Sequence, residues 1–162
     1  MFTEARMAKA EEILKKCGDR HWRLSAAESC TGGLFAALMT EVPGSSVVLG
    51  RSFVTYSNRA KREVLNVPAA LLEQHGAVSE PVVEAMAQNL FDMTTAHLTI
   101  AVSGVAGPGG GSAEKPVGTV HMATATADGI VHIRQSFGDI GRREVRLATL
   151  DAGLDMLLHR LN

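Results

Sequence analysis

The apolar residues of this chain follow two periods that alternate along the sequence, one typical of helices and one typical of strands. Apolar positions three or four residues apart among charged residues predict amphipathic helices, whereas short, nearly continuous apolar runs predict strands. Gly18 is expected to end the first helix. The predicted helices cover residues 8–17, 34–42, 59–65, 68–74, 80–93 and 142–161, and the predicted strands cover 22–26, 47–56, 98–102, 117–125 and 130–137. Strands that alternate with helices, with one hairpin among them, favour a three-layer α/β/α domain with a mixed sheet.

The last two predicted strands form a hairpin. Asp128-Gly129 is a strong signal for a two-residue turn between them. A turn at these residues sets a register in which His121 lies opposite Ser136. His121 and His132 are therefore not expected to be neighbours.

Composition and charge limit the function classes. The 162 residues, 46% hydrophobic and 20% charged, fit one soluble globular domain that spans residues 1–162. Sixteen basic and seventeen acidic residues give a net charge of -1, so no overall field attracts nucleic acid or an anionic membrane. No apolar run is long enough to cross a bilayer. Several apolar helix faces could supply a homo-oligomer interface.

The cysteines and histidines predict neither a disulfide framework nor a metal site. Cys17 and Cys30 lack a further cysteine at metal-ligand spacing, and the six histidines show no ligand pattern. We expect two reduced thiols, no metal and a cytoplasmic location.

The best nucleophile candidates lie at residues 27–33, where an apolar run ends and a helical pattern begins. A sharp strand-to-helix turn exposes the side chain at the bend beside unpaired helix N–H groups. Ser29 is the candidate nucleophile, but serine is also a common helix N-cap. Cys30 is its rival, because a thiol near a helix N-terminus is acidified, although small cysteines are usually buried and inert.

Lys61 is the candidate general base. If Ser57 or Asn58 caps the helix at 59–65, Lys61 lies in the first turn, where the helix dipole and nearby arginines lower its pKa. A neutral lysine can activate a serine, whereas a solvated surface lysine cannot. Tyr56, the only tyrosine, ends the preceding strand and either hydrogen-bonds in the site or packs there with its hydroxyl in water.

A glycine-rich loop at residues 103–116 follows the predicted central strand, and ligands collect at such positions in α/β sheets. It matches neither the Walker nor the dinucleotide fingerprint, so ATP and NAD are not indicated. The loop is either a long turn or an anion nest. Arg142 and Arg146, at the start of the last helix, are either solvated or share an anionic ligand.

Seven stretches together carry a family resemblance over nearly the whole chain. They are residues 27–33, 43–46, 53–58, 60–61, 75–80, 104–111 and 115–120. In this order they resemble the C-terminal domain of the competence/damage-inducible protein CinA, a domain that also occurs alone as nicotinamide mononucleotide deamidase. The departures from the family pattern, at Ser52, Arg59 and His121-Met122, are mild.

The resemblance implies a three-layer α/β/α sandwich with a five-stranded mixed sheet, and a cofactor-free amidohydrolase that converts nicotinamide mononucleotide and water to nicotinic acid mononucleotide and ammonia. It makes Ser29 the nucleophile and Lys61 the base. Tyr56, from its position at the end of the strand before Lys61, is a further catalytic candidate. The chemistry then assigns the oxyanion to N–H groups near Thr31 and Gly32, and leaves Thr31 as the candidate helix cap. The remaining substrate-binding candidates are Ser103, Gly107, Gly109, Gly110, Arg142 and Arg146.

Three hypotheses remain open at this point. The domain is either this enzyme or a nucleotide-binding or partner-binding module without turnover. A third hypothesis is a thiol-dependent amidase that uses Cys30 instead of Ser29.

Overall fold

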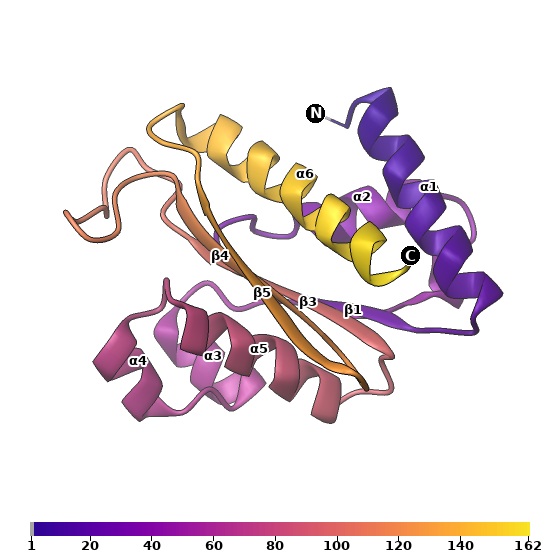
Figure 1. Ribbon diagram of the computed structural model, residues 1–162, viewed down its shortest axis with the longest axis horizontal. Helices are drawn as coiled ribbons and strands as arrows, with labels where there is room; N and C mark the ends of the chain where they lie inside the picture. The colour runs from indigo at the N-terminus through magenta and orange to yellow at the C-terminus, as the bar shows by residue number, and fades with distance from the viewer. Residues whose placement is uncertain (1) are drawn as a thin grey trace.

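A computed structural model describes residues 2–162. In the chain order of Figure 1, the helices are α1 (Glu4–Asp19), α2 (Leu34–Glu41), the short 3-10 helix η1 (Ser45–Val47), α3 (Asn58–Leu65), α4 (Ala69–His75), α5 (Glu80–Asp92) and α6 (Arg142–Arg160). The strands are β1 (Leu24–Glu28), β2 (Leu49–Val54), β3 (Leu98–Gly104), β4 (Thr119–Thr126) and β5 (Gly129–Ser136).

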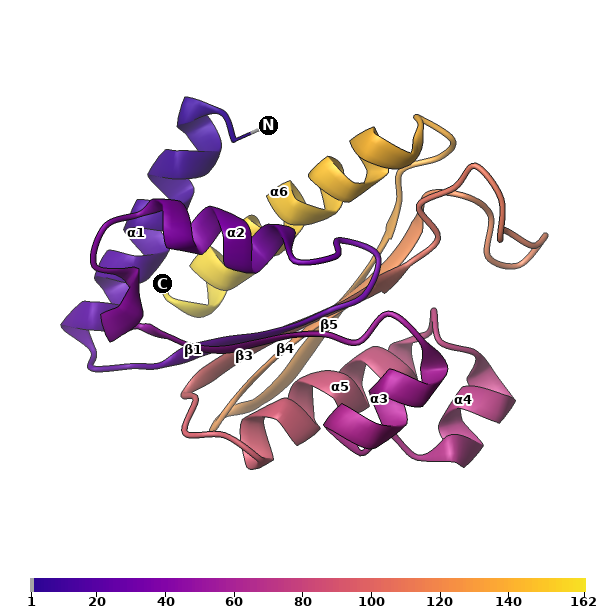
Figure 2. The same cartoon turned by 180° about the vertical axis from the view of Figure 1, so that it is seen from behind.

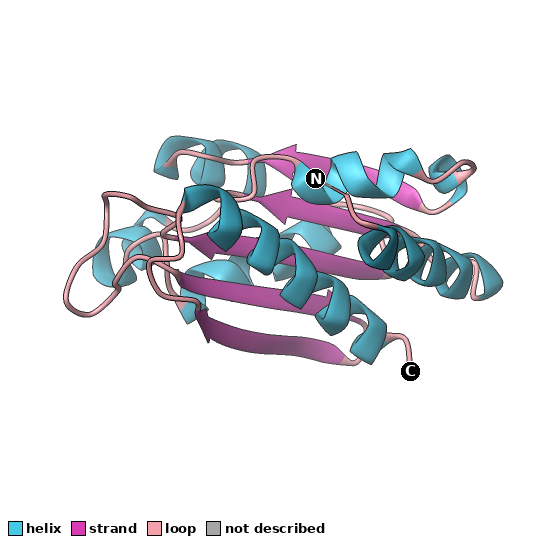
Figure 3. Cartoon of the chain, turned by 90° about the horizontal axis from the view of Figure 1, so that it is seen from above, coloured by secondary structure: helices cyan, strands magenta, loops and turns pink. Residues whose placement is uncertain are grey.

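The five strands form one mixed sheet in the order β2-β1-β3-β4-β5 (Figure 3). Strands β2, β1 and β3 are parallel, and β4 and β5 continue the sheet in antiparallel fashion. Helices α1, α2 and α6 cover one face, and α3, α4 and α5 cover the other (Figures 1 and 2). The predicted α/β class and five-stranded mixed sheet are therefore confirmed.

Both faces of the central strands are buried, which explains their nearly continuous apolar sequence. Ile100 and Met122 pack with the layer of α1, α2 and α6. Their neighbours Ala101 and Ala123 pack with α5 on the opposite face. Small alanine side chains there let α5 lie close to the sheet.

Two local predictions were wrong. Gly18 does not end the first helix, because α1 continues to Asp19 and the chain reverses only at His21, whose φ is 54°. The hairpin turns at residues 127–128 instead of 128–129, because Gly129, with φ 111°, begins β5 and pairs with Thr126.

The shifted register brings two histidines together. His121 now pairs with Arg134, and His132 lies diagonally across from it on the same face. The rings stack with centroids 5.1 Å apart, and His121 Nδ1 lies 2.9 Å from His132 Nε2. The expectation that these residues are not neighbours was therefore wrong. Burial, with His132 beside it, lowers the pKa of His121 to about 4.

Among residues 2–162, no helix has the length and apolar character that a membrane span requires.

Candidate active site

The ends of the three parallel strands bring the candidate chemistry to one edge of the sheet. Because parallel strands end on the same side, Ser29 after β1 lies beside the segments that follow β2 and β3. Two backbone hydrogen bonds extend the sheet past these ends. Ser29 N–H donates to the Val102 carbonyl at 3.1 Å, and Thr55 N–H donates to the Glu28 carbonyl at 2.8 Å.

The helix cap at this turn is Glu28, not Ser29 or Thr31. The buried Glu28 carboxylate accepts the N–H groups of Gly33 (2.9 Å), Phe35 (3.2 Å) and Ala36 (3.1 Å). A carboxylate at a helix N-terminus satisfies unpaired donors and complements the helix dipole. Because Glu28 does this from the end of β1, the Ser29 hydroxyl is free for another role.

Ser29 and Lys61 form a hydrogen-bonded pair. Lys61 Nζ lies 3.0 Å from Ser29 Oγ and donates to the Thr55 carbonyl at 2.7 Å. Lys61 is only 1% exposed and Ser29 only 8%. Ser57 accepts the Ala60 N–H at 3.0 Å, so the predicted cap of α3 is confirmed, and the helix places Lys61 toward the sheet.

Burial lowers the pKa of Lys61 to about 8. The direction matches the prediction, but the main cause is desolvation and not the helix dipole or the neighbouring arginines. Arg59 is engaged with Glu63 on the exposed side of α3. The amine therefore loses its proton near pH 8 instead of above pH 10, so a fraction of it is available as a general base at neutral pH.

Cys30 has the opposite electrostatic character. Its thiol is buried, and burial raises its pKa to about 11. A thiol in this state is a poor nucleophile at neutral pH. The geometry therefore favours Ser29 over Cys30.

A cavity of about 190 Å³ opens beside the Ser29–Lys61 pair. Side chains and backbone from five separate segments line it. They are Ser29, Cys30, Tyr56, Lys61, Ala77, Val78, Ser103, Gly104, Ala106 and Arg142. The predicted residues Ser29, Tyr56, Lys61, Ser103 and Arg142 are thus brought to one cavity.

Arg142 joins two segments at this cavity. Its guanidinium donates to the Tyr56 hydroxyl at 2.6 Å and to the Gly107 carbonyl at 2.9 Å. Tyr56 is 59% exposed, so its ring lies at the mouth and not in the core. Ser103, in contrast, is buried and donates to the Ala77 carbonyl at 2.8 Å.

The other predicted binding residues do not line this cavity. Gly109 and Gly110 lie in the exposed part of the loop that extends beyond the sheet (Figure 1). Gly32 N–H donates to the Ser29 carbonyl at 3.1 Å and is therefore not free for a ligand. Arg146 donates to the carbonyls of Cys30 and Thr31.

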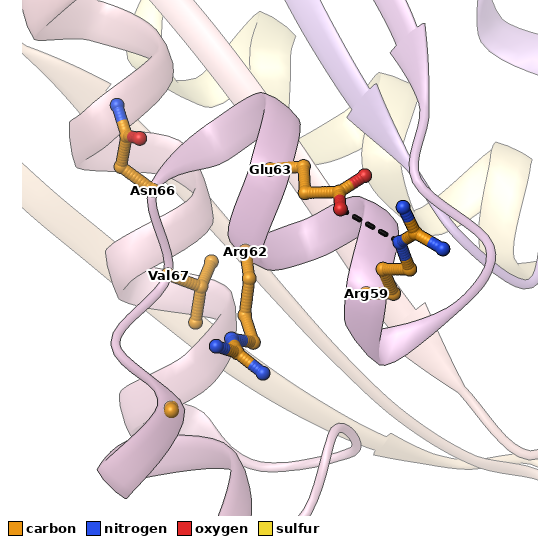
Figure 4. A pocket seen from close by; sticks show the side chains of 6 residues that line it. Arg59, Arg62, Glu63, Asn66 and Val67 are labelled. Carbon is orange, nitrogen blue, oxygen red and sulfur yellow. Dashed lines mark hydrogen bonds and ion pairs between the residues drawn. The ribbon is translucent and has the colours of Figure 1, made fainter.

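A larger cavity, of about 490 Å³, is lined by residues of α3 and of the segment that leads into α4 (Figure 4). Arg59 and Arg62 line it, and Arg59 pairs with Glu63 at 2.6 Å. No serine, cysteine or lysine is among its lining residues. Its size therefore does not make it a candidate for nucleophilic chemistry.

Glu28 and the segment 77–78 are the contributors that sequence reasoning did not assign. Glu28 directly precedes Ser29, and an acidic residue four or more positions before an apolar helix start is an unusual capping signal. Ala77 and Val78 carry no chemical signal at all. Only the packing of the chain between α4 and α5 brings them to the cavity.

Comparison with known proteins now places this geometry in a family. The sequence profile of the CinA C-terminal domain matches residues 6–161. The chain belongs to the CinA C-terminal domain family. The crystal structure of the competence/damage inducible protein CihA from Agrobacterium tumefaciens is 46% identical, with a TM-score of 0.95 over 98% of this chain and 97% of that one.

Curated relatives of this CinA domain fall into two lengths. A CinA-like protein of Parasynechococcus marenigrum is 52% identical over 139 residues, which are 85% of this chain and 33% of that protein. The chain thus spans about a third of the length of such relatives. The nicotinamide-nucleotide amidohydrolase PncC of Enterobacter agglomerans is 52% identical over 128 residues, 78% of this chain and 77% of that protein.

Proposed function

We propose that this CinA domain acts as a single catalytic unit that hydrolyses the carboxamide of nicotinamide mononucleotide, giving nicotinic acid mononucleotide and ammonia. The observation that carries the proposal is the buried Lys61 amine, 3.0 Å from Ser29 Oγ and with its pKa lowered to about 8. The 52% identity to a nicotinamide-nucleotide amidohydrolase supports this choice of substrate.

In the proposed acylation, the neutral Lys61 amine donates one N–H to the Thr55 carbonyl and points its lone pair at the Ser29 hydroxyl. Ser29 Oγ attacks the carboxamide carbon while Lys61 takes the hydroxyl proton. Lys61 then passes a proton to the departing nitrogen, and the C–N bond breaks to release ammonia. Water, deprotonated by Lys61, attacks the acyl-enzyme. The C–O bond to Ser29 then breaks as Lys61 returns the proton to Ser29 Oγ, which releases the acid and restores the pair.

The oxyanion needs N–H donors near Ser29 Oγ. Across residues 2–162, Cys30 N–H and Thr31 N–H have no backbone or side-chain oxygen as acceptor, whereas Gly32 N–H is taken by the Ser29 carbonyl. We therefore assign this role to the N–H groups of Cys30 and Thr31. Serine hydrolases with a nucleophile at a strand-to-helix turn use the donor that follows the nucleophile in the same way.

Arg142 is the proposed phosphate ligand. It lines the cavity, and within the described chain no carboxylate lies within ion-pair distance of it. Its present partners, Tyr56 and Gly107, are neutral acceptors at the mouth, which a phosphate can replace with a charge-assisted contact. The cavity of about 190 Å³ then holds the pyridine ring, and the ribose phosphate lies outward toward Arg142 and the glycine-rich loop.

The test is direct. The protein is incubated with nicotinamide mononucleotide, ammonia is measured by a coupled assay, and nicotinic acid mononucleotide is identified by chromatography. We expect both products in equal amounts with the wild type and neither with Ser29→Ala. Binding without ammonia release would instead identify a module without turnover.

A second variant tests the phosphate ligand. Arg142→Gln should raise KM for the mononucleotide by about tenfold, from the loss of one charge-assisted contact, and leave KM for the nucleoside nicotinamide riboside unchanged. Arg143→Gln, a change at the adjacent exposed arginine, serves as the matched control. An equal rise in KM for both substrates would show that Arg142 does not bind the phosphate.

A further inference from the structure

One side chain of α6 contacts the turn that carries the nucleophile. Arg146 Nε donates to the Cys30 carbonyl at 3.1 Å, and Arg146 Nη2 donates to the Thr31 carbonyl at 2.7 Å. We propose that Arg146 is a positioning residue that fixes the two peptide planes of this turn, so that the Thr31 N–H, one of the two donors assigned to the oxyanion, faces the nucleophile. This inference rests on the proposed serine chemistry but not on the identity of the substrate.

Peptide geometry gives the direction. In a planar trans peptide, the C=O and N–H bonds point in opposite directions. Because one guanidinium holds the carbonyls of Cys30 and Thr31, the N–H groups of Thr31 and Gly32 both point away from Arg146. Gly32 N–H is seen to reach the Ser29 carbonyl, so Thr31 N–H points to the same side of the turn.

Nothing else holds these two carbonyls. Within residues 2–162, neither the Cys30 nor the Thr31 carbonyl accepts a hydrogen bond from any group but Arg146. The next residues, Gly32 (φ 61°) and Gly33 (φ 99°), have the widest backbone freedom. Without Arg146, a carbonyl of this turn can rotate toward Ser29, where its negative end opposes a developing oxyanion.

Glu28 fixes the turn from its other end. Its carboxylate accepts hydrogen bonds from the N–H groups of Gly33, Phe35 and Ala36. The Arg146 guanidinium donates to the carbonyls of the residues just before them. The turn is thus held between a negative and a positive side chain. A planar guanidinium offers two donors in a fixed fork, whereas a lysine ammonium is a single point of donors on a flexible stem, so lysine should replace the contact only in part.

The experiment compares Arg146→Ala, Arg146→Lys and the control Arg143→Ala. We expect Arg146→Ala to lower kcat for ammonia release by about 100-fold with little change in KM, since an oxyanion contact acts in the transition state. Arg146→Lys should fall between the wild type and Arg146→Ala, and Arg143→Ala should match the wild type. Millimolar guanidinium should restore part of the activity of Arg146→Ala, because it supplies the missing donor group. It would not restore a variant that is inactive because it is unfolded.

A second readout does not depend on the substrate. The rate at which a fluorophosphonate probe modifies Ser29, followed by intact mass, should fall in Arg146→Ala in parallel with kcat and recover with guanidinium. If the wild type reacts at Ser29 but releases no ammonia from nicotinamide mononucleotide, the proposed substrate is wrong and the probe still decides the role of Arg146. The inference is overturned if the probe modifies Ser29 of Arg146→Ala at the wild-type rate. It is also overturned if Arg146→Ala raises KM and leaves kcat unchanged.

Discussion

The pKa of Lys61 sets the pH range in which the proposed enzyme can work. With a pKa of about 8, about 9% of the amine is neutral at pH 7, whereas an ordinary lysine with a pKa near 10.5 is neutral in only about 0.03% of molecules. Burial of Lys61 thus supplies about 300 times more of the competent base. This population factor corresponds to about 3 kcal/mol, and the weaker basicity of the amine offsets part of it.

The assay is kcat/KM for ammonia release from pH 6 to pH 10 in the wild type and in Lys61→Met. We expect kcat/KM of the wild type to rise about tenfold per pH unit below the pKa of Lys61 and to level off above about pH 8. Lys61→Met keeps the length of the side chain but has no amine, so it should lose most turnover at every pH. Substantial activity in Lys61→Met, or a profile that still climbs past pH 10, would refute Lys61 as the base.

The same pKa predicts a stability change. Because the folded pKa of Lys61 lies below its unfolded value, the unfolded state binds more protons between about pH 8 and pH 10.5. The free energy of unfolding should therefore gain about 3 kcal/mol across this range from Lys61. Denaturant unfolding of wild type and Lys61→Met at both ends of the range isolates this contribution, because the other titrating groups cancel in the difference.

Three further predictions concern the neighbours of the dyad and the paired histidines. Ser29→Ala should abolish ammonia release, whereas Cys30→Ala should keep most of it, and the reverse result would make Cys30 the nucleophile. Glu28→Gln should lower the free energy of unfolding by about 2 to 3 kcal/mol, since an amide replaces a buried carboxylate that accepts three N–H groups; urea unfolding would show it, and an unchanged midpoint would contradict this role. The pKa of His121 is lowered to about 4, so the unfolded state binds more protons below about pH 6.5 and stability should fall as the pH drops from there toward 4. His121→Gln should have a flatter stability profile over this range, and an equally steep one would exclude His121 as the cause.

Local sequence patterns were enough to predict the elements that hold the dyad. An apolar run followed by small residues and glycines predicts the strand and turn at Ser29, and Ser57 predicts the start of α3. Both signals act within a few residues. The dyad itself followed from the family resemblance, because no local pattern shows that α3 turns Lys61 toward β1.

The contacts that the sequence did not predict depend on distant segments. Desolvation of Lys61 needs the packed layers around it, so its cause was misjudged even though the direction of the pKa shift was right. The hairpin turn moved by one residue, and the cross-strand pairing by two, because Gly129 serves as the first residue of β5. Glu28 replaced Thr31 as the cap because the end of β1 lies close enough to α2 for a longer side chain to reach three N–H groups.

The contact between α6 and the nucleophile turn also bears on synthesis. Ser29 and Lys61 are translated early, but Arg146 follows Thr31 by 115 residues. At roughly 5 to 20 residues per second, a ribosome needs about 6 to 23 s to add that length. A nascent chain therefore carries the proposed nucleophile and base well before it carries the guanidinium proposed to orient the turn. On this proposal, full amidase activity develops only after α6 has emerged and docked on the sheet.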